Sequence, residues 1–343
     1  MVMSVTMDQS NKYARRLQGD PVGDQMFQYL KQESSTFSEF MTLSSNQAFW
    51  DYLTKHPELK QLLGESFSQK AHDIEEYNKG VIFFERHVSP VLTVLGLYSL
   101  PYCYCGRNGA RVLVTSNKII QQPEKRLAET AEFVMDVCDR QGFDPEGKAY
   151  LAIAKVRAMH AAARYYAKRS IKDEEPVNQD DMLATLLSFS LIVIRGLRKM
   201  GVSVSNSEVE AFLYMWNVIG LKLGIEQVHL PKSIREASRL ERDITKREFA
   251  ASDEGVRLTQ SLLHFLNSQK ELLKLGVSAE DLMNYFLGSN AQLLGIEPGK
   301  ATYQGLVDVV IKTSTFIRSF SEISYYSVKK QISKEVSALN AEQ

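Results

Sequence analysis

The stretch that decides the fold runs from residue 126 to residue 164 and reads RLAETAEFVMDVCDRQGFDPEGKAYLAIAKVRAMHAAAR. Its apolar residues recur at helical spacing on both sides of a turn, which predicts two amphipathic helices in an antiparallel hairpin. Gly142 suits the end of the first helix, and Asp144-Pro145 suits the start of the second. The rest of the chain is expected to pack around this hairpin.

Polar side chains fall at matching heights on the two predicted helices. Arg126, Glu129 and Thr130 are spaced i, i+3 and i+4 on the first helix, so they share one face. Glu129 lies 15 residues before Asp144, and His160 lies 16 residues after it. With a rise of ~1.5 Å per residue, Glu129 and His160 are expected to stand almost level across the hairpin.

The second predicted helix carries a histidine between two arginines on a surface of small side chains. Arg157, His160 and Arg164 are spaced i, i+3 and i+7. The residues around the imidazole are alanines at positions 158, 161, 162 and 163. Such a flat apolar surface suits a planar macrocycle, with the histidine on the iron and the arginines on the propionates. It is also typical of tight helix packing around a core histidine, so both interpretations stay open at this point.

A series of sequence blocks, in a consistent order, resembles the catalytic domain of the rubber oxygenase (latex-clearing protein) family, which includes fungal oxygenases that cleave terpenoid side chains. The likeness covers roughly residues 80 to 260. Its blocks are SLPYCY at 99–104, GARVL at 109–113, RLAETAEFV at 126–134, VRAMHAAAR at 156–164, PVNQD at 176–180, TLLSFSLIVIRGLRKMG at 185–201 and WNVIGLKLGI at 216–225. The resemblance implies an all-α, globin-like core that holds haem b.

The family's functional positions can be carried over residue by residue. The proximal haem ligand falls on His160, and the Arg-x-x-x-Thr pattern of the facing helix falls on Arg126 and Thr130. Two positions depart from the family. Rubber-cleaving members have a lysine where Glu129 stands, and their upstream catalytic glutamate has no acidic counterpart in residues 106–110, which read GRNGA. The resemblance thus implies haem binding, whereas cleavage of polyisoprene does not follow from it.

We therefore expect a haem b-dependent oxygenase that uses O₂ to oxidise or cleave an apolar, isoprenoid or lipid-like small molecule. Arg126, Glu129 and Thr130 are the candidate catalytic residues, and Glu129 has three possible roles: weak iron ligand, proton acceptor at an allylic carbon, or ion-pair partner of Arg126. Neutral His160 would ligate the iron while its other ring nitrogen donates to a carbonyl or carboxylate. The alternative is a haem-binding or cofactor-free helical interaction protein, in which His160 is a core residue.

Length and composition bound the architecture. The 343 residues are 24% charged and 44% hydrophobic, which allows one large core. The formal net charge of +0 gives no support to nucleic-acid binding. We predict an all-α fold with a multi-helix globin-like core and additional helices at both ends. A flexible segment 1–24 would precede one helical domain over 25–343, with a haem-binding core at about 80–260 and C-terminal helices at 261–336.

The remaining signals concern location and competing metal sites. Three cysteines do not complete a disulfide framework or a zinc site, and residues 1–23 contain no apolar signal region, so we expect a cytoplasmic protein. Residues 87–106 carry no Asp, Glu, Lys or Arg, and we expect a buried core helix there rather than a membrane span. Glu226 and His229 have the spacing of a di-iron motif, but no second pair accompanies them, and a solvated loop is expected.

Overall fold

The computed structural model describes residues 14–68, 72–116, 118–268, 277–297 and 325–341. Within these ranges the chain forms helices joined by short connections, and its one extended pairing is an isolated bridge between Gly106 and Phe249. The predicted all-α fold class is therefore confirmed.

The helices carry the following bounds. The α-helices are α2 (Pro21–Lys31), α3 (Ser34–Thr42), α4 (Asn46–Lys55), α5 (Pro57–Ser68), α6 (Ile74–Arg86), α7 (Val88–Val94), α8 (Leu100–Tyr104), α9 (Arg107–Val114), α10 (Lys118–Gln121), α11 (Pro123–Val137), α12 (Ala149–Ala167), α13 (Gln179–Phe189), α14 (Leu191–Lys199), α15 (Asn206–Lys222), α16 (Ile234–Glu248), α17 (Asp253–Asn267), α19 (Ala279–Leu287) and α22 (Tyr325–Ala341). A π-helix, η1, spans Leu95–Ser99, and 3₁₀ helices span Gln227–His229 (η2) and Gly288–Leu294 (η3).

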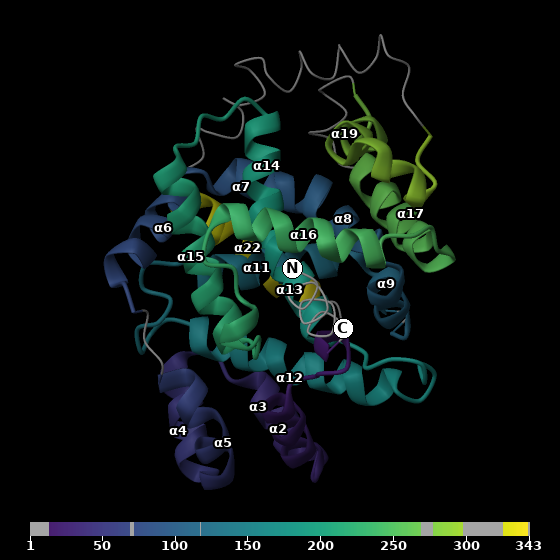
Figure 1. Ribbon diagram of the computed structural model, residues 1–343. Helices are drawn as coiled ribbons and strands as arrows, with labels where there is room; N and C mark the ends of the chain where they lie inside the picture. Colours follow the sequence, from purple (N-terminus) through teal and green to yellow (C-terminus); the bar gives the residue numbers. More distant parts are fainter. Residues whose placement is uncertain (1–13, 69–71, 117, 269–276, 298–324, 342–343) are drawn as a thin grey trace, which may run out of the picture.

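Helix α12 runs across the lower part of the molecule in the view of Figure 1, with the N-terminal helices α2 to α5 below it and the remaining helices above. Helices α6 and α15 pack together at one side. A Cβ added to Gly80 of α6 would lie 2.6 Å from the backbone oxygen of Ala211 of α15, so this close approach requires a glycine.

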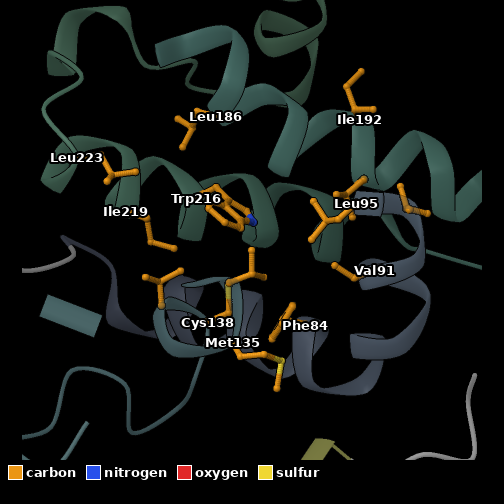
Figure 2. Packing of buried hydrophobic residues seen from close by; sticks show 14 of the residues in the cluster. Phe84, Val91, Leu95, Met135, Cys138, Leu186, Ile192, Trp216, Ile219 and Leu223 are labelled. Atoms are coloured by element: carbon orange, nitrogen blue, oxygen red, sulfur yellow. The ribbon is translucent and has the colours of Figure 1, made fainter. Parts of the chain in front are cut away.

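The hydrophobic core centres on Trp216 of α15, which is 1% exposed. Its ring stacks on that of Phe189, with the centroids 5.1 Å apart. Figure 2 shows side chains from four other parts of the chain around it, namely Phe84, Leu95, Met135 and Leu186. One contiguous cluster extends from Met26 to Val336, as expected for a single domain, although the exact boundaries of that domain stay a prediction.

The central hairpin is present as α11 and α12, but the second helix begins at Ala149 rather than near Pro145. The reason lies in the turn, whose carbonyl oxygens accept hydrogen bonds from residues at the start of α4. The backbone N–H groups of Asn46 and Gln47, at the start of α4, donate to the carbonyl oxygens of Gly147 and Pro145 at 2.8 and 2.9 Å. The Asn46 side chain also donates to Gly142 and Asp144 at 2.8 and 2.6 Å. Tertiary contacts thus hold the turn in a non-helical shape.

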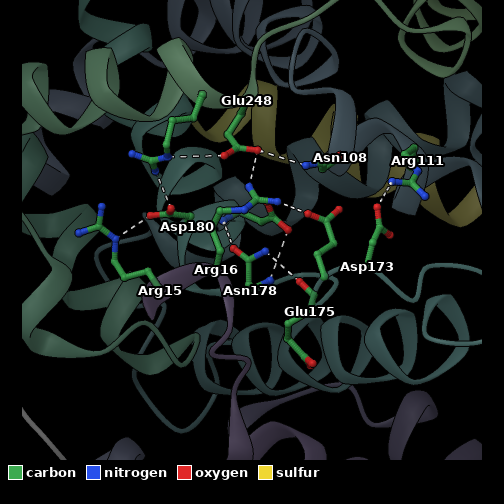
Figure 3. A network of polar contacts seen from close by, with 12 residues as sticks. Arg15, Arg16, Asn108, Arg111, Asp173, Glu175, Asn178, Asp180 and Glu248 are labelled. Carbon is green, nitrogen blue, oxygen red and sulfur yellow. Dashed lines mark hydrogen bonds and ion pairs between the residues drawn. The ribbon is translucent and has the colours of Figure 1, made fainter. Parts of the chain in front are cut away.

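The described part of the predicted flexible segment 1–24, residues 14–24, makes ion pairs with other helices and includes the start of α2, while the predicted flexibility itself stays a prediction. Arg15 pairs with Asp180 at 2.6 Å, and the other oxygen of Asp180 pairs with Arg247 at 2.6 Å. Arg16 forms ion pairs with Glu174 and Glu248. Figure 3 shows these side chains gathered in one network. Because Asp180 is fully buried, its two arginine partners anchor the segment firmly. Residues 1–13 lie outside the described ranges.

Residues 87–106 form α7, η1 and α8, whose side chains are largely buried, so the expected core helix is confirmed with a π-helical turn in its middle. Across the described ranges, no individual helix has the length and apolar character needed to cross a bilayer. Helix α6 and the stretch Val88–Tyr104 meet that test only as a pair, and the pair is bent by 82°. Of the predicted C-terminal helices, α17, α19 and α22 are described, while residues 298–324 lie outside the described ranges.

Candidate functional site

Helix α12 has two faces of different character. One face is filled by buried side chains: Ile153, Ala154, Arg157, Ala158, Ala161 and Arg164. Two of them, Arg157 and Arg164, pair with Asp20 and Asp24 at the start of α2. A second stripe, spaced i, i+4, i+8 and i+11, is only partly covered: Ala152, Val156, His160 and Ala163. Protein packing therefore leaves the His160 face incompletely filled, although most of its side chains are apolar.

Helix α11 packs tightly only near the turn. Its fully buried residues are Val134, Met135 and Val137, whereas every residue from Pro123 to Phe133 is partly exposed. The hairpin is thus well covered at its closed end and less covered at its open end. Arg126, on α11, and His160, on α12, both lie toward that open end, where a flat ligand between the helices would have to sit.

One ring nitrogen of His160, Nδ1, is buried without a hydrogen-bond partner among the described residues. Burial, followed by the charges of Arg164 and Arg126, lowers the pKa of His160 to about 4. The ring is therefore neutral at pH 7, which is the form that ligates a metal. Among the described residues Nδ1 has no bond to a carbonyl or carboxylate, and the expected hydrogen bond from the second ring nitrogen of a ligating His160 stays a prediction.

The three candidate catalytic residues on α11 mostly interact with one another. Arg126 and Glu129 form an ion pair of 3.4 Å, with both side chains about two-fifths exposed. The hydroxyl of Thr130 donates to the backbone oxygen of Arg126 at 2.8 Å. Of the three roles considered for Glu129, the ion pair is the one present in this structure.

The structure brings Arg126 toward residues of two other helices. Its charge lowers the pKa of His160 on α12. It also opposes the burial that raises the pKa of Tyr104 on α8. Arg126 thus acts electrostatically on both His160 and Tyr104. Tyr102 turns elsewhere, since its hydroxyl donates to Glu241 of α16.

The guanidinium of Arg157 donates hydrogen bonds only to acceptors within the described chain, so it is not available to bind a propionate. Its Nε and Nη2 atoms contact the two carboxylate oxygens of Asp20 at 2.6 and 2.7 Å. Its Nη1 atom donates to the Ser66 hydroxyl at 3.0 Å and to the Lys222 backbone oxygen at 3.4 Å. The predicted role of Arg157 as a direct cofactor contact is therefore not supported by its geometry, because each of its guanidinium nitrogens already has a partner.

Arg164 is also buried, but one of its guanidinium nitrogens has no hydrogen-bond partner within the described ranges. Its Nε atom donates to Asp24 at 2.8 Å and its Nη1 atom to the Val177 backbone oxygen at 2.6 Å. Its Nη2 atom is buried and has no partner within the described ranges. A buried donor without an acceptor costs about 1–3 kcal/mol, so a carboxylate reaching this atom would be bound favourably.

These observations fit a haem at His160. The Nδ1 atom of the neutral imidazole and the Nη2 atom of Arg164 are buried polar atoms without partners among the described residues, on neighbouring turns of one helix. The stripe that carries His160 otherwise holds two alanines and a valine. A ligating nitrogen, a cationic donor and a low apolar surface are what such a group requires.

Two features of the structure had no clear signal in the sequence. Glu248 of α16 accepts a hydrogen bond of 3.4 Å from Asn108, so an acid does reach the segment 106–110, although it is ion-paired with Arg16 (Figure 3). A surface pocket of about 590 Å³ lies where α10 and the start of α11 meet α17. Its lining residues are Ile120, Gln121, Pro123, Glu124, Arg257, Gln260, Ser261, His264, Phe265 and Ser268. Because none of them is on α12, this pocket is separate from His160.

The competing Glu226 and His229 pair lies at η2, where the two side chains are 3.6 Å apart. No group of three or more possible metal-ligating His, Cys, Asp or Glu residues occurs in the part of the chain that the structure describes. Gln227 and Val228, between the two residues, are exposed and form part of a short 3₁₀ helix.

Comparison with known proteins places this geometry in a family. The profile described as "ER-bound oxygenase mpaB/B'/Rubber oxygenase, catalytic domain" matches residues 106–307, which is more than half of the chain and includes all the candidate residues on α11 and α12. A solved structure of latex clearing protein in the closed state superposes with a TM-score of 0.74, over 93% of this chain and 90% of that one, at 17% identity. That likeness concerns the fold.

A curated relative, the rubber oxygenase of Streptomyces sp. (strain K30), is 28% identical over 145 residues. The match covers 40% of this chain and 36% of the relative, so it spans about a third of the relative's length. On the strength of the profile match, this chain belongs to the ER-bound oxygenase mpaB/B'/rubber oxygenase catalytic-domain family.

Proposed function

We propose that this protein is a haem b-dependent oxygenase that uses O₂ to oxidise or cleave an apolar small molecule of isoprenoid or lipid-like character. Membership of an oxygenase family supports the reaction class. The observation that carries the haem assignment is His160, a neutral histidine with a buried ring nitrogen that has no protein partner in the described structure.

The roles of the side chains follow from their surroundings. His160 would hold the iron, and the Nη2 atom of Arg164 would pair with a propionate. When bound, the haem would supply the activation of O₂. Arg126 would orient a polar oxygen on the opposite side, because its guanidinium is partly exposed and held by a single ion pair of 3.4 Å. Glu129 would accept a proton from the substrate after leaving Arg126.

The apolar class of substrate is supported by the exposed part of α11. Leu127, Ala128, Ala131 and Phe133, on the helix that carries Arg126, pack against the hydrophobic core and keep part of their apolar surface exposed. An alkene or alkyl chain placed beside them would remove that surface from water, at about 25 cal/mol per Å². The lack of a lysine at position 129 and of an acid in residues 106–110 argues for a substrate or a proton path different from that of the rubber-cleaving members.

The test is the absorption spectrum of the purified protein loaded with hemin, before and after dithionite and CO. We expect a Soret band that shifts on reduction and shifts again with CO, since the side opposite His160 would be open. O₂ uptake in the presence of candidate isoprenoid alkenes then tests the reaction. A protein that takes up no hemin would refute the haem assignment, and hemin binding without O₂ uptake for any alkene would favour a binder.

The ion pair of Arg126 and Glu129 favours that second candidate, a haem-binding or cofactor-free helical interaction protein. In this structure the two residues neutralise each other, and Thr130 is hydrogen-bonded within its own helix. The three residues would then stabilise α11 rather than act on a substrate. The hemin and O₂ measurements separate the two candidates.

A further inference from the structure

We propose that Asp20 and Asp24, at the start of α2, are positioning residues for His160, and that they act through Arg157 and Arg164 as a clamp on α12. This inference deepens the proposed function and rests on it for the identity of the ligand that His160 holds. The clamp itself is a property of the protein without ligand.

The first half of the clamp is the pair of Asp20 and Arg157. Both side chains are 3% exposed, and two bonds of 2.6 and 2.7 Å join the planar guanidinium to the planar carboxylate. This bidentate geometry fixes orientation as well as distance. A buried pair of this kind is costly to break, because the remaining partner becomes an uncompensated buried charge.

Glycines confine the Asp20 carboxylate on two sides. A Cβ added to Gly23 would lie 2.3 Å from the Oδ2 atom of Asp20, and one added to Gly224 would lie 2.4 Å from the same atom. Gly224 also has a φ of +96°, which other residues adopt only with strain. The carboxylate therefore occupies a space that the backbone leaves free for it.

The second half of the clamp repeats this arrangement four residues later. Asp24 pairs with Arg164 at 2.8 Å, and a Cβ added to Gly19 would lie 3.0 Å from the Arg164 side chain. The stretch Gly19-Asp20-Pro21-Val22-Gly23-Asp24 thus holds two Gly-Asp pairs, and each Asp contacts one arginine of α12.

The two contacts lie on either side of His160. Arg157 is three residues before His160 and Arg164 is four residues after it, so each lies about one helical turn away. Held at both points, this part of α12 has little freedom to rotate or shift, and His160 is positioned with it.

The main test compares Asp20→Asn with the intact protein. Asparagine keeps the size of the side chain but leaves the Arg157 charge uncompensated near His160. By analogy with other partners that orient metal ligands, we expect hemin to be lost about 10- to 100-fold faster. We also expect a more positive haem reduction potential, because the added positive charge favours the ferrous state. Asp24→Asn, at a side chain that is 39% exposed, should give the same changes in weaker form.

Glu241→Gln is the matched control for loss of a buried carboxylate. Glu241 is 6% exposed and pairs with Arg195 of α14 at 2.7 Å, and it also accepts a hydrogen bond from Tyr102 of α8. We expect this variant to lower stability without changing the rate of hemin loss or the potential. If Asp20→Asn and Glu241→Gln affect hemin equally, Asp20 has no specific positioning role and the proposal is overturned.

A steric variant tests the clamp without changing any charge. Gly23→Ala would push a methyl group against the Asp20 carboxylate, whereas Gly64→Ala on α5 would meet no atom within 4 Å. Alanine normally stabilises a helix by about 0.5–1 kcal/mol relative to glycine. We expect Gly64→Ala to show this gain, and Gly23→Ala to lose hemin faster despite its better helix propensity. Equal behaviour of the two variants would contradict the clamp.

Amide hydrogen exchange of the ligand-free protein separates this proposal from the haem assignment. In Asp20→Asn and Gly23→Ala, loss of the clamp should raise the rate of amide hydrogen exchange in residues 149–167. In Glu241→Gln and Gly64→Ala, that rate should stay as it is in the intact protein. If the intact protein binds no hemin and this pattern is still seen, the haem assignment fails and the clamp stands. If exchange in α12 is unchanged in the clamp variants, the clamp is refuted whatever the hemin result.

Discussion

The two helices of the central hairpin differ in how firmly their polar residues are held. On α12, Arg157 and Arg164 are 3% and 1% exposed and are each bound to a carboxylate of the N-terminal segment. On α11, Arg126 and Glu129 are about two-fifths exposed and bind only each other in the contacts seen here. One helix is fixed in place, and the other presents side chains that can change partners.

This difference suggests a division of labour. A ligand to a metal has to be held within a fraction of an ångström, so the helix that carries His160 benefits from rigid support on both sides. In the proposed function Arg126 and Glu129 would meet O₂ and the substrate, and their partly exposed side chains would allow a change of partner. The following predictions test this contrast, beginning with the largest expected effect.

His160→Ala is expected to abolish stoichiometric hemin binding while leaving the helical content largely unchanged. The alanine removes the ligating nitrogen, and it fits a helix surface that is already rich in alanine. Hemin titration followed by the Soret band, with far-ultraviolet circular dichroism as the control for folding, is the measurement. Full hemin stoichiometry in this variant would disprove the assignment of His160 as the iron ligand.

Arg157→Ala is expected to lower the free energy of unfolding by about 3–5 kcal/mol, because it leaves the buried Asp20 carboxylate without its partner. Chemical denaturation of the ligand-free protein measures the effect. Arg86→Ala is the control, since its ion pair with Glu208 is largely exposed and should be worth less than about 1 kcal/mol. A similar decrease in the free energy of unfolding in both variants would mean that the buried pair on α12 is held no more firmly than an exposed ion pair.

The stability of the ligand-free protein should depend on His160 between pH 6.5 and about 4. The pKa of His160 is about 4 in the folded chain, against 6.5 for an ordinary histidine, so in this range the unfolded chain binds the extra proton. The contribution is complete above pH 6.5 and is lost as the pH falls toward 4, by at most about 3 kcal/mol. Unfolding at a series of pH values should show a steeper loss of stability toward pH 4 in the intact protein than in His160→Ala, in which only other groups, such as Asp136 with its pKa raised to about 6, still titrate.

Arg126→Ala should have the smallest effect on stability, no more than about 1 kcal/mol, because its ion pair with Glu129 is largely exposed. It should nevertheless raise the pKa of His160, since the Arg126 charge is one of the causes that lower it. Nuclear magnetic resonance titration of the imidazole measures that change. A large loss of stability with no change at His160 would mean that Arg126 supports the fold rather than the site.

The sequence predicted the local chemistry of the hairpin well. The 3.6-residue period of its apolar residues specifies two helices, and the spacing of His160, Arg157 and Arg164 places them on neighbouring turns whatever surrounds them. The resemblance of separate blocks to one family identified the fold class, which the structure confirms. The helices depend on residues that are close together in the chain, and the family resemblance depends on sequence blocks that occur in the same order as in the family.

The partners of those residues came only from the tertiary structure. Nothing near Arg157 in the sequence indicates that Asp20, 137 residues away, occupies its guanidinium, or that Asn46 prevents helix formation at Pro145. Side-chain type and periodicity determined which groups lie on a helix face. Long-range packing decided which of these groups are already paired and which remain available, because a buried charge takes the partner that the fold brings to it.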